Sequence, residues 1–265
     1  MTFFSMHISK ISKFFSLLKK SVTWMRCWPP IPPSIYGSIG EDVVIEHHLY
    51  YLGLDTKKVG AYLDIGGYHP VYLSNTFRFY GRATGFVVDI GESKHKLWRK
   101  LRPRDTFIKK AIVPNNCLDE KVTFVKNSNY GTGLDHVEGY GHEPTTESQH
   151  LTTNPLQIEV DVLRAEDLGK LVLSDNRWHV AAWRVLSIDI EGLDYEVLRD
   201  IAIEELRPDV IAAEDHVPDT ISESGILEWY TTNSKIVDLL KAKSYALVSV
   251  VGPTLIFVRI DSKIH

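Results

Sequence analysis

Short apolar segments alternate with helix-like segments along residues 61–260, and this alternation constrains the fold more than any other feature of the sequence. The apolar segments are predicted strands, which cover residues 61–65, 84–89, 106–113, 184–189, 210–214, 246–251 and 254–260. Helices are predicted between them at residues 74–80, 94–101, 195–201 and 236–241. Buried strands separated by amphipathic helices are typical of a mostly parallel sheet with helices on both faces.

The last two predicted strands are separated only by Gly252 and Pro253. Two residues are too few for a crossover helix, so these strands are expected to pair in the antiparallel direction. The predicted fold class is therefore α/β: a doubly wound, mostly parallel sheet with an antiparallel terminal strand.

Residues 117–163 interrupt the alternation of strands and helices. Two strands are predicted there, at 122–125 and 158–163, and they form a hairpin around a polar loop at residues 127–155. Such a long loop inside a compact domain is usually functional or disordered. Because it follows the third predicted strand, we expect it to cover the carboxyl ends of the strands as a substrate lid.

The charge pattern divides the chain into an N-terminal appendage, residues 1–33, and an α/β domain, residues 34–265. Up to Gly40 there are four lysines, one arginine and no acidic residue, and apolar residues recur at spacings of three and four. This pattern predicts a basic amphipathic helix that ends in a proline-rich linker. Three partners remain open for the helix: its own domain, a second subunit of a homo-oligomer or, through residues 1–28, an anionic membrane surface.

The composition limits the class of protein. A net charge of -4 argues against a dedicated nucleic-acid binder. Cys27 and Cys117 have no metal-ligand spacing, which favours a reducing compartment. The predicted location is the cytoplasm, with peripheral attachment to the inner membrane face if the N-terminal helix binds lipid. The basic residues within 94–104 are expected to form a solvated face.

The ends of the first two predicted strands indicate a nucleoside site. Asp64, Gly66 and Gly67 end the first strand, and Asp89 ends the second. Glycines allow a sharp turn and a close approach of the backbone. An acid at the end of the second strand is placed to accept hydrogen bonds from both ribose hydroxyls. His69, in the same turn, is more typical of a turn-packing residue than of a catalytic base.

Two cofactor classes contain such a nucleoside. A dinucleotide such as NAD favours Gly-x-Gly-x-x-Gly with a helix that begins at once at the pyrophosphate, whereas Pro70 stands where the third glycine would be. Asp64 would also place negative charge near that pyrophosphate. S-adenosylmethionine has no phosphate and carries a sulfonium and an ammonium group, so the acidic residue is compatible with it.

A second group of acidic residues follows the fourth and fifth predicted strands: Asp189 and Glu191 after one, Glu214, Asp215 and His216 after the other. These strands are expected in the same half of the sheet, so the side chains should converge. Asp189, Glu214 and Asp215 are candidate ligands of Mg²⁺, which would lower the pKa of a substrate hydroxyl. Without a metal, Asp189, Glu191 and His216 are the candidate catalytic residues, with His216 as general base.

Taken in order, these motifs resemble the FkbM-type methyltransferases, and the agreement runs from about residue 38 to residue 258. The matching residues are Ser38, Gly40, Glu41, Asp42, Asp64, Gly66, Gly67, His69, Pro70, Ser74, Asn75, Thr76, Gly85, Asp89, Ser187, Asp189, Glu191, Gly192, Asp194, Arg207, Pro208 and Glu214. The resemblance implies a Rossmann-like class I methyltransferase that uses S-adenosylmethionine to methylate a hydroxyl of a sugar, glycan or natural product.

The resemblance also implies roles for individual residues. The implied cofactor-binding residues are Asp64, Gly66, Gly67, Ser74, Asn75 and Asp89. Those implied to face the reacting centre are Asp189, Glu191 and Glu214. Two positions depart from the family pattern, because Asp89-Ile90 replaces Glu-Pro and Ser187 replaces a common lysine. These departures leave a weakened or altered enzyme open. An NAD(P)-dependent oxidoreductase and a non-catalytic methyltransferase-like binding protein also remain alternatives.

Overall fold

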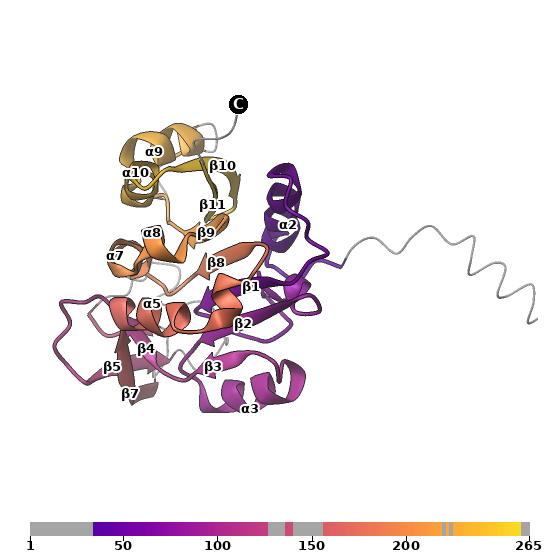
Figure 1. Cartoon of the computed structure of the whole chain (residues 1–265). Coiled ribbons are helices and arrows are strands. Elements are labelled where there is room, and N and C mark those ends of the chain that lie inside the picture. The colour runs from indigo at the N-terminus through magenta and orange to yellow at the C-terminus, as the bar shows by residue number, and fades with distance from the viewer. Residues whose placement is uncertain (1–33, 127–135, 140–155, 219–220, 223–224, 261–265) are drawn as a thin grey trace, which may run out of the picture. The chain divides into compact units, whose positions relative to one another are not determined.

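The structure is a computed structural model that describes residues 34–126, 136–139, 156–218, 221–222 and 225–260 (Figure 1). The chain divides into two units, Met1–Ser34 and Ile35–His265, and the fold below belongs to the second. The predicted N-terminal helix and most of the predicted loop at 127–155 lie outside the described residues, so their roles stay predictions.

A seven-stranded sheet organises the second unit, in the order β10-β11-β9-β8-β1-β2-β3. Its strands are β1 (Gly60–Ile65), β2 (Ala83–Val88), β3 (Thr106–Ile108), β8 (Arg184–Ile188), β9 (Val210–Glu214), β10 (Tyr245–Val251) and β11 (Thr254–Arg259). Neighbouring strands from β9 to β3 pair in parallel, whereas β11 pairs antiparallel with both β9 and β10. The antiparallel terminal pair predicted from Gly252 and Pro253 is confirmed.

The direction in which the chain adds strands reverses between β1 and β8. From β1 the chain moves outward through β2 to β3, and it later returns to β8 and continues through β9 on the other side. At such a reversal the connections leave on opposite faces, which opens a crevice beyond the carboxyl ends of the strands. This is the place where a doubly wound sheet is expected to bind a ligand.

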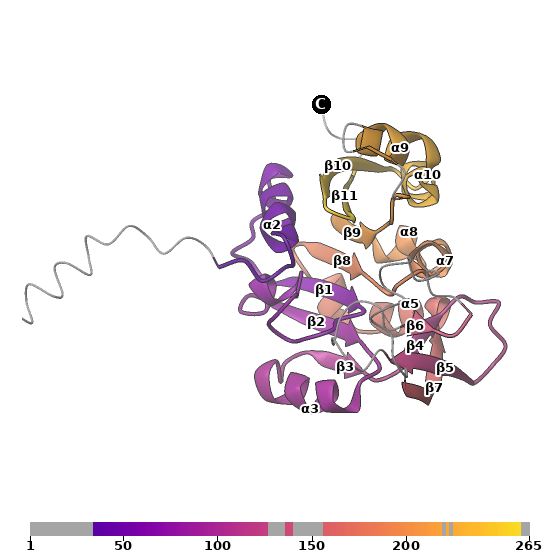
Figure 2. The same cartoon turned by 180° about the vertical axis from the view of Figure 1, so that it is seen from behind.

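Helices cover both faces of this sheet, as Figures 1 and 2 show from opposite sides. One face packs against α2 (Glu41–Tyr51), the 3-10 turn η1 (Phe77–Phe79) and α3 (Glu92–Leu101). The other packs against α5 (Ala165–Leu173), α6 (Asn176–His179), α7 (Asp194–Asp200), α8 (Ile203–Leu206), α9 (Ile226–Asn233) and α10 (Lys235–Ala242). Successive strand residues alternate between the two cores, so Tyr62 packs in the first and Leu63 in the second.

A second sheet has four strands in the order β4-β7-β5-β6. They are β4 (Ala111–Val113), β5 (Lys121–Lys126), β6 (His136–Val137) and β7 (Leu156–Arg164). The predicted hairpin is confirmed, because β5 pairs antiparallel with β7. The single strand predicted at 106–113 is wrong, since β3 pairs with β2 and β4 pairs with β7 of the other sheet.

The helix predicted at 74–80 is also wrong. The described residues there form only the 3-10 turn Phe77–Phe79. Ser74 Oγ accepts a hydrogen bond from the Phe77 backbone N–H at 3.1 Å, and the Ser74 N–H donates to the Tyr36 carbonyl at 2.8 Å. A serine hydroxyl that bonds nearby backbone offers an alternative to helical hydrogen bonding, so the segment turns instead.

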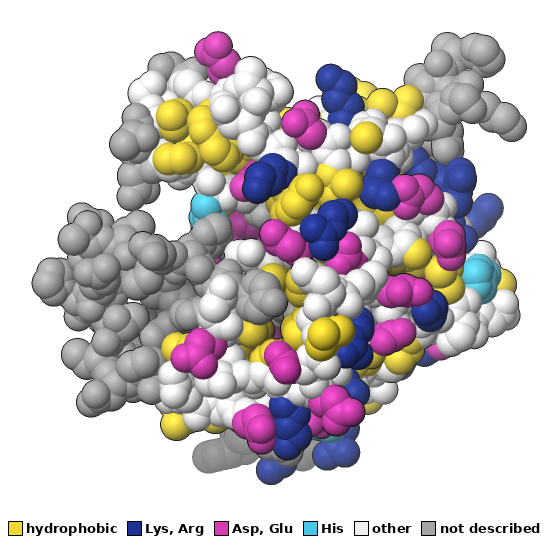
Figure 3. Space-filling model, turned by 90° about the vertical axis from the view of Figure 1, so that its left-hand side faces the viewer, with side chains coloured by type: hydrophobic (Ala, Val, Ile, Leu, Met, Phe, Trp, Pro, Cys, Tyr) yellow, Lys and Arg dark blue, Asp and Glu magenta, His cyan; other side chains and the backbone are white. Residues whose placement is uncertain are grey.

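One face of the surface is shown in Figure 3, where acidic and basic side chains are interspersed with small apolar areas. A mixture of this kind is ordinary for a solvated protein surface. Among the described residues, no helix has both the length and the apolar character needed to cross a membrane.

Candidate functional site

A cavity of about 310 Å³ lies at the reversal of the strand order, beyond the carboxyl ends of β1, β2, β8 and β9. Its volume is at the lower end of the range for small-molecule sites. The sequence-predicted site residues that line it are Gly66, Asn75, Asp89, Asp189, Glu191 and Glu214. Those that do not line it are Asp64, Gly67, Ser74, Asp215 and His216. The structure therefore brings together both predicted groups, the strand-end glycine with Asp89 and the acids of β8 and β9.

The turn after β1 depends on glycine for packing within the protein. Gly66 has a φ of +87°, and a Cβ atom there would lie 1.8 Å from the backbone oxygen of Asp189. A Cβ atom on Gly67 would lie 2.5 Å from the side chain of Val87. The turn therefore packs closely against the end of β8, where Asp189 lines the cavity, while the predicted close approach of this backbone to a ligand stays a prediction.

Asp64 lies behind the turn. Its carboxylate is 5% exposed and accepts a 2.5 Å hydrogen bond from the Thr76 hydroxyl. Burial raises the pKa of Asp64 to about 6. Because Asp64 does not line the cavity, the predicted direct contact with a ligand is corrected: its place fits a residue that holds the turn. Ser74 is likewise buried, and its hydroxyl accepts from the Phe77 N–H and from Arg102.

Asp89 stands at the cavity, at the end of β2. Its Oδ1 accepts hydrogen bonds from the backbone N–H groups of Ile90 at 2.6 Å and Gly91 at 3.0 Å, which fixes the carboxylate. Beside it the cavity wall is apolar and is made by Val88, Ile90, Ala111, Ile112, Phe124 and Val137. A carboxylate held in place beside an apolar wall suits a ligand that combines hydroxyl groups with a flat ring.

Acidic residues line the opposite part of the cavity: Glu41, Asp189, Glu191 and Glu214. Among the described residues that line it, Lys110 is the one lysine or arginine. Glu41, at the start of α2, is a cavity-lining acid that the sequence indicated only as part of the family motif. Nothing local to residue 41 indicates that α2 begins beside the ends of β8 and β9.

The surrounding protein raises the pKa values of Asp189, Glu214 and the nearby Asp194. For Asp189 the pKa is well above its usual range, first through desolvation and then through the charge and hydrogen bond of Glu214. Desolvation raises the pKa of Glu214 to about 7. Asp194, which is 5% exposed and accepts from the Ile190 N–H at 3.4 Å, has a pKa of about 8, through desolvation and then the charge of Asp189. Asp189 and Glu214 thus form a pair that holds a proton near neutral pH.

These raised pKa values make the stability of the fold depend on pH. The folded pKa values of about 8 for Asp194 and about 7 for Glu214 lie above the ordinary values of 3.8 and 4.5, so the folded chain keeps protons that the unfolded chain releases. The free energy of unfolding is therefore expected to fall from about pH 5 to about pH 8, by at most about 1.4 kcal/mol per pH unit for each group. Urea denaturation across this range measures the slope, and Asp194→Asn should make it shallower. A flat profile, or an equal slope in the variant, would count against the raised values.

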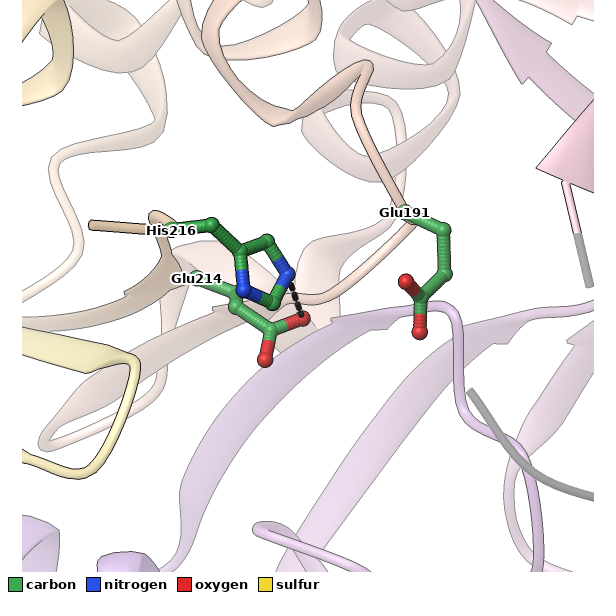
Figure 4. A group of neighbouring side chains, drawn as sticks. All are labelled: Glu191, Glu214 and His216. Carbon is green, nitrogen blue, oxygen red and sulfur yellow. Dashed lines mark ion pairs between the residues drawn. The ribbon is translucent and has the colours of Figure 1, made fainter. Parts of the chain in front are cut away.

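Asp215 and His216 differ from their predicted places. The Asp215 carboxylate accepts a 2.5 Å hydrogen bond from Ser234, the N-cap of α10, so the prediction of Asp215 as a metal ligand is corrected. The side chains of Glu214 and His216 instead point to the same side of the chain, and 3.6 Å separates Nε2 of His216 from Oε2 of Glu214 (Figure 4). Residues two apart in an extended chain point the same way, and the residue between them points away. His69 Nδ1 accepts from the N–H groups of residues 71 and 72, as a turn-packing histidine does.

No family model matches the sequence, and no curated protein matches it. The chain is similar to the solved structure of an O-methyltransferase family protein from Burkholderia thailandensis, with 13% identity, a TM-score of 0.37, and coverage of 84% of this chain and 59% of that one. It is also similar to N,N-8-amino-8-demethyl-D-riboflavin dimethyltransferase (RosA) from Streptomyces davawensis, with 14% identity, a TM-score of 0.35, and coverage of 82% and 56%. The chain spans less than two thirds of either protein's length.

The fold class follows from the topology of the sheet. A doubly wound parallel sheet in which the last strand inserts antiparallel beside β9 is the Rossmann-like class I methyltransferase arrangement. The fold class predicted from the sequence is confirmed.

Proposed function

We propose that this chain is an S-adenosylmethionine-dependent methyltransferase that acts on a hydroxyl of a sugar, glycan or natural-product acceptor. The observation that carries the proposal is one cavity with two unlike ends, Asp89 beside an apolar wall at one and clustered acids at the other. The resemblance to FkbM-type methyltransferases supports the hydroxyl acceptor. The cytoplasmic location, and the binding of residues 1–28 to a membrane or a second subunit, belong to the same proposal.

The end of the cavity at β2 fits the nucleoside. Asp89 would accept hydrogen bonds from the ribose hydroxyls, and the wall that includes Val88, Ile90 and Ile112 would pack against the adenine ring. Asn75 also lines the cavity, and its Nδ2 donates to Ser187 Oγ at 3.3 Å, which orients its side chain. In the proposed complex Gly66 and Asn75 border the methionine part.

The acidic end fits the cationic part of the cofactor and the acceptor. When bound, S-adenosylmethionine supplies a methyl group on a positively charged sulfur, and acids nearby favour that charge. Asp189 and Glu214 share a proton near neutral pH, so the ionised member of the pair is a base for the acceptor hydroxyl. A general base is most effective when its pKa is close to the working pH.

The helix arrangement favours this cofactor over NAD. A pyrophosphate is bound at a helix N-terminus directly after the glycine turn. Here the described residues after Gly67 form a turn, and the first helical element is the three-residue η1 at Phe77. Acids at the far end of the cavity would also repel phosphate groups.

Calorimetry with S-adenosylhomocysteine tests the proposal. We expect binding in the micromolar range and at least about tenfold weaker binding by Asp89→Asn, because a hydrogen bond to a charged group contributes roughly 1.5–3 kcal/mol. The variant keeps an oxygen that can accept from residues 90 and 91. Asp167→Asn, an exposed acid on α5, is the control and should bind as the unaltered chain does. No binding by the unaltered chain, or equal binding by Asp89→Asn, would reject the proposal, and NADH binding in a parallel fluorescence titration would favour the oxidoreductase.

A further inference from the structure

Three side chains that can bind a metal ion meet beside the acidic end of the cavity, which Glu191 and Glu214 line and His216 does not. Glu191 follows β8, Glu214 ends β9, and His216 follows it. One possible ligand atom of each lies within 4.8 Å of the other two. Figure 4 shows the imidazole beside the carboxylate of Glu214, with the carboxylate of Glu191 facing them from the other chain segment.

We propose that Glu191, Glu214 and His216 bind a divalent transition-metal ion. One imidazole nitrogen with two carboxylate oxygens is a donor set that suits Mn²⁺, Fe²⁺ or Zn²⁺, whereas Mg²⁺ prefers oxygen ligands alone. This set replaces the one predicted from the sequence, which included Asp189 and Asp215 and named Mg²⁺.

The distances are close to those of a bound ion. The 3.6 Å between His216 Nε2 and Glu214 Oε2 fits two ligands of one metal. Ligands about 2.1 Å from an ion are separated by at most about 4.2 Å, so Glu191 must bring its carboxylate up to roughly 1 Å closer. A glutamate can do this by side-chain rotation, without a change in the backbone.

Two features of the surroundings favour a cation at this place. Glu41, Asp189, Glu191 and Glu214 line the cavity, and Lys110 is the one lysine or arginine among its described lining residues. In addition, Oδ1 of Asp194 is a buried carboxylate oxygen with no hydrogen-bond partner among the described residues. Asp194 is only 5% exposed. Its other oxygen accepts a hydrogen bond from the N–H of Ile190, in the loop that carries Glu191. A divalent ion would favour the ionised form of these neighbouring carboxyl groups.

The metal would deepen the proposed function, and this step rests on it. An ion held by three protein ligands keeps positions open for other oxygens. An acceptor with two neighbouring hydroxyls could occupy them, and the ion would lower the pKa of the hydroxyl that receives the methyl group. This favours a vicinal diol, as in a sugar, over an isolated alcohol.

Binding of Mn²⁺ to the full chain tests the site directly. The protein is treated with EDTA, dialysed and titrated with Mn²⁺, and bound ion is measured by electron paramagnetic resonance and by calorimetry. We expect one ion per chain, and affinity at least about tenfold lower in both Glu191→Gln and His216→Ala, because each removes one of three ligands. Asp215→Asn is the matched control, since its side chain bonds to Ser234, and it should bind Mn²⁺ as the unaltered chain does. Zn²⁺ should displace Mn²⁺, and Mg²⁺ at the same concentration should not.

The outcomes separate the metal site from the proposed function. No Mn²⁺ binding, or equal binding in the two ligand variants, overturns the metal site and leaves His216 and Glu214 as an ion pair. Loss in Asp215→Asn equal to that in His216→Ala also overturns it, because the ligands would then not be these three. S-adenosylhomocysteine binding is measured on the same samples: its absence with intact Mn²⁺ binding rejects the methyltransferase and keeps the metal site.

Discussion

Replacing Gly66 by alanine is expected to lower the free energy of unfolding by roughly 2–5 kcal/mol and to weaken S-adenosylhomocysteine binding at least about tenfold. The backbone at Gly66 has a φ of +87°, which costs an L-residue about 1–2 kcal/mol. The added Cβ atom would also lie 1.8 Å from the Asp189 carbonyl oxygen. That oxygen belongs to the backbone and cannot rotate away, so β1 and β8 must separate.

The loss of binding follows from the same displacement. Gly66 donates its N–H to the Val88 carbonyl at 2.9 Å, and the Asp189 N–H donates to the Ile65 carbonyl at 3.0 Å. These bonds tie the cavity-lining ends of β1, β2 and β8 together, so separating them changes the shape of the site. Urea denaturation and calorimetry measure the two effects.

Gly81→Ala is the matched control for this substitution. A Cβ atom on Gly81 would have no heavy atom within 4 Å, and its φ lies outside the left-handed region. The change in stability should stay within about 0.5 kcal/mol, and the affinity should not change. If Gly66→Ala behaved as this control does, the close packing of the turn against β8 would not exist in solution.

Replacing Arg102 by methionine is expected to cost about 3–5 kcal/mol of stability, the usual effect of removing one partner of a buried ion pair. Arg102 is 1% exposed. Its Nε donates to Asp105 at 2.6 Å, and its Nη2 donates to the Tyr62 hydroxyl at 2.6 Å and to the Thr76 hydroxyl at 3.1 Å. Its guanidinium also stacks on Trp98, 4.2 Å from the ring centroid.

This substitution also affects the support of the glycine turn that borders the cavity. The Thr76 hydroxyl that accepts from Arg102 donates to Asp64, behind the glycine turn. The methionine variant leaves the Asp105 carboxylate buried, with the Tyr62 hydroxyl as a remaining donor. A double variant, Arg102→Met with Asp105→Asn, should recover part of the lost stability because it removes the uncompensated charge.

Arg99→Met is the control for Arg102: Arg99 is an exposed residue of α3, the helix that ends just before Arg102, and its replacement should change the free energy of unfolding by less than about 0.5 kcal/mol. Urea denaturation compares the chains. Equal stability of Arg102→Met and Arg99→Met, or no recovery in the double variant, would show that the buried network contributes little.

Local sequence patterns were enough to predict most strands of the seven-stranded sheet. Strand β9 was predicted at 210–214 and is found at Val210–Glu214, because a buried strand is recognisable from its own apolar residues. The antiparallel end of the sheet followed from Gly252 and Pro253, since two residues allow only a hairpin. The division of 106–113 into β3 and β4 was not predictable, because β4 pairs with β7, a partner far along the chain.

Part of the candidate site, too, could be predicted from local patterns and part could not. Its position at the strand ends, with Asp89, Asp189, Glu191 and Glu214 around it, could be predicted because parallel strands end at one edge. The metal set could not, because it depends on the side to which each residue after β9 points.

The sequence by itself determined the α/β class, the antiparallel terminal strand and the edge of the sheet where the acids gather. Only the tertiary structure showed that Asp64 supports the turn from behind, that Arg102 is buried although it lies in a run of surface bases, and that Asp215 accepts a hydrogen bond from Ser234, the N-cap of α10, while His216 lies beside Glu191 and Glu214. The physical reason is that strand formation and turn length are set by neighbouring residues, whereas the partner of a side chain is set by elements that fold against it from elsewhere.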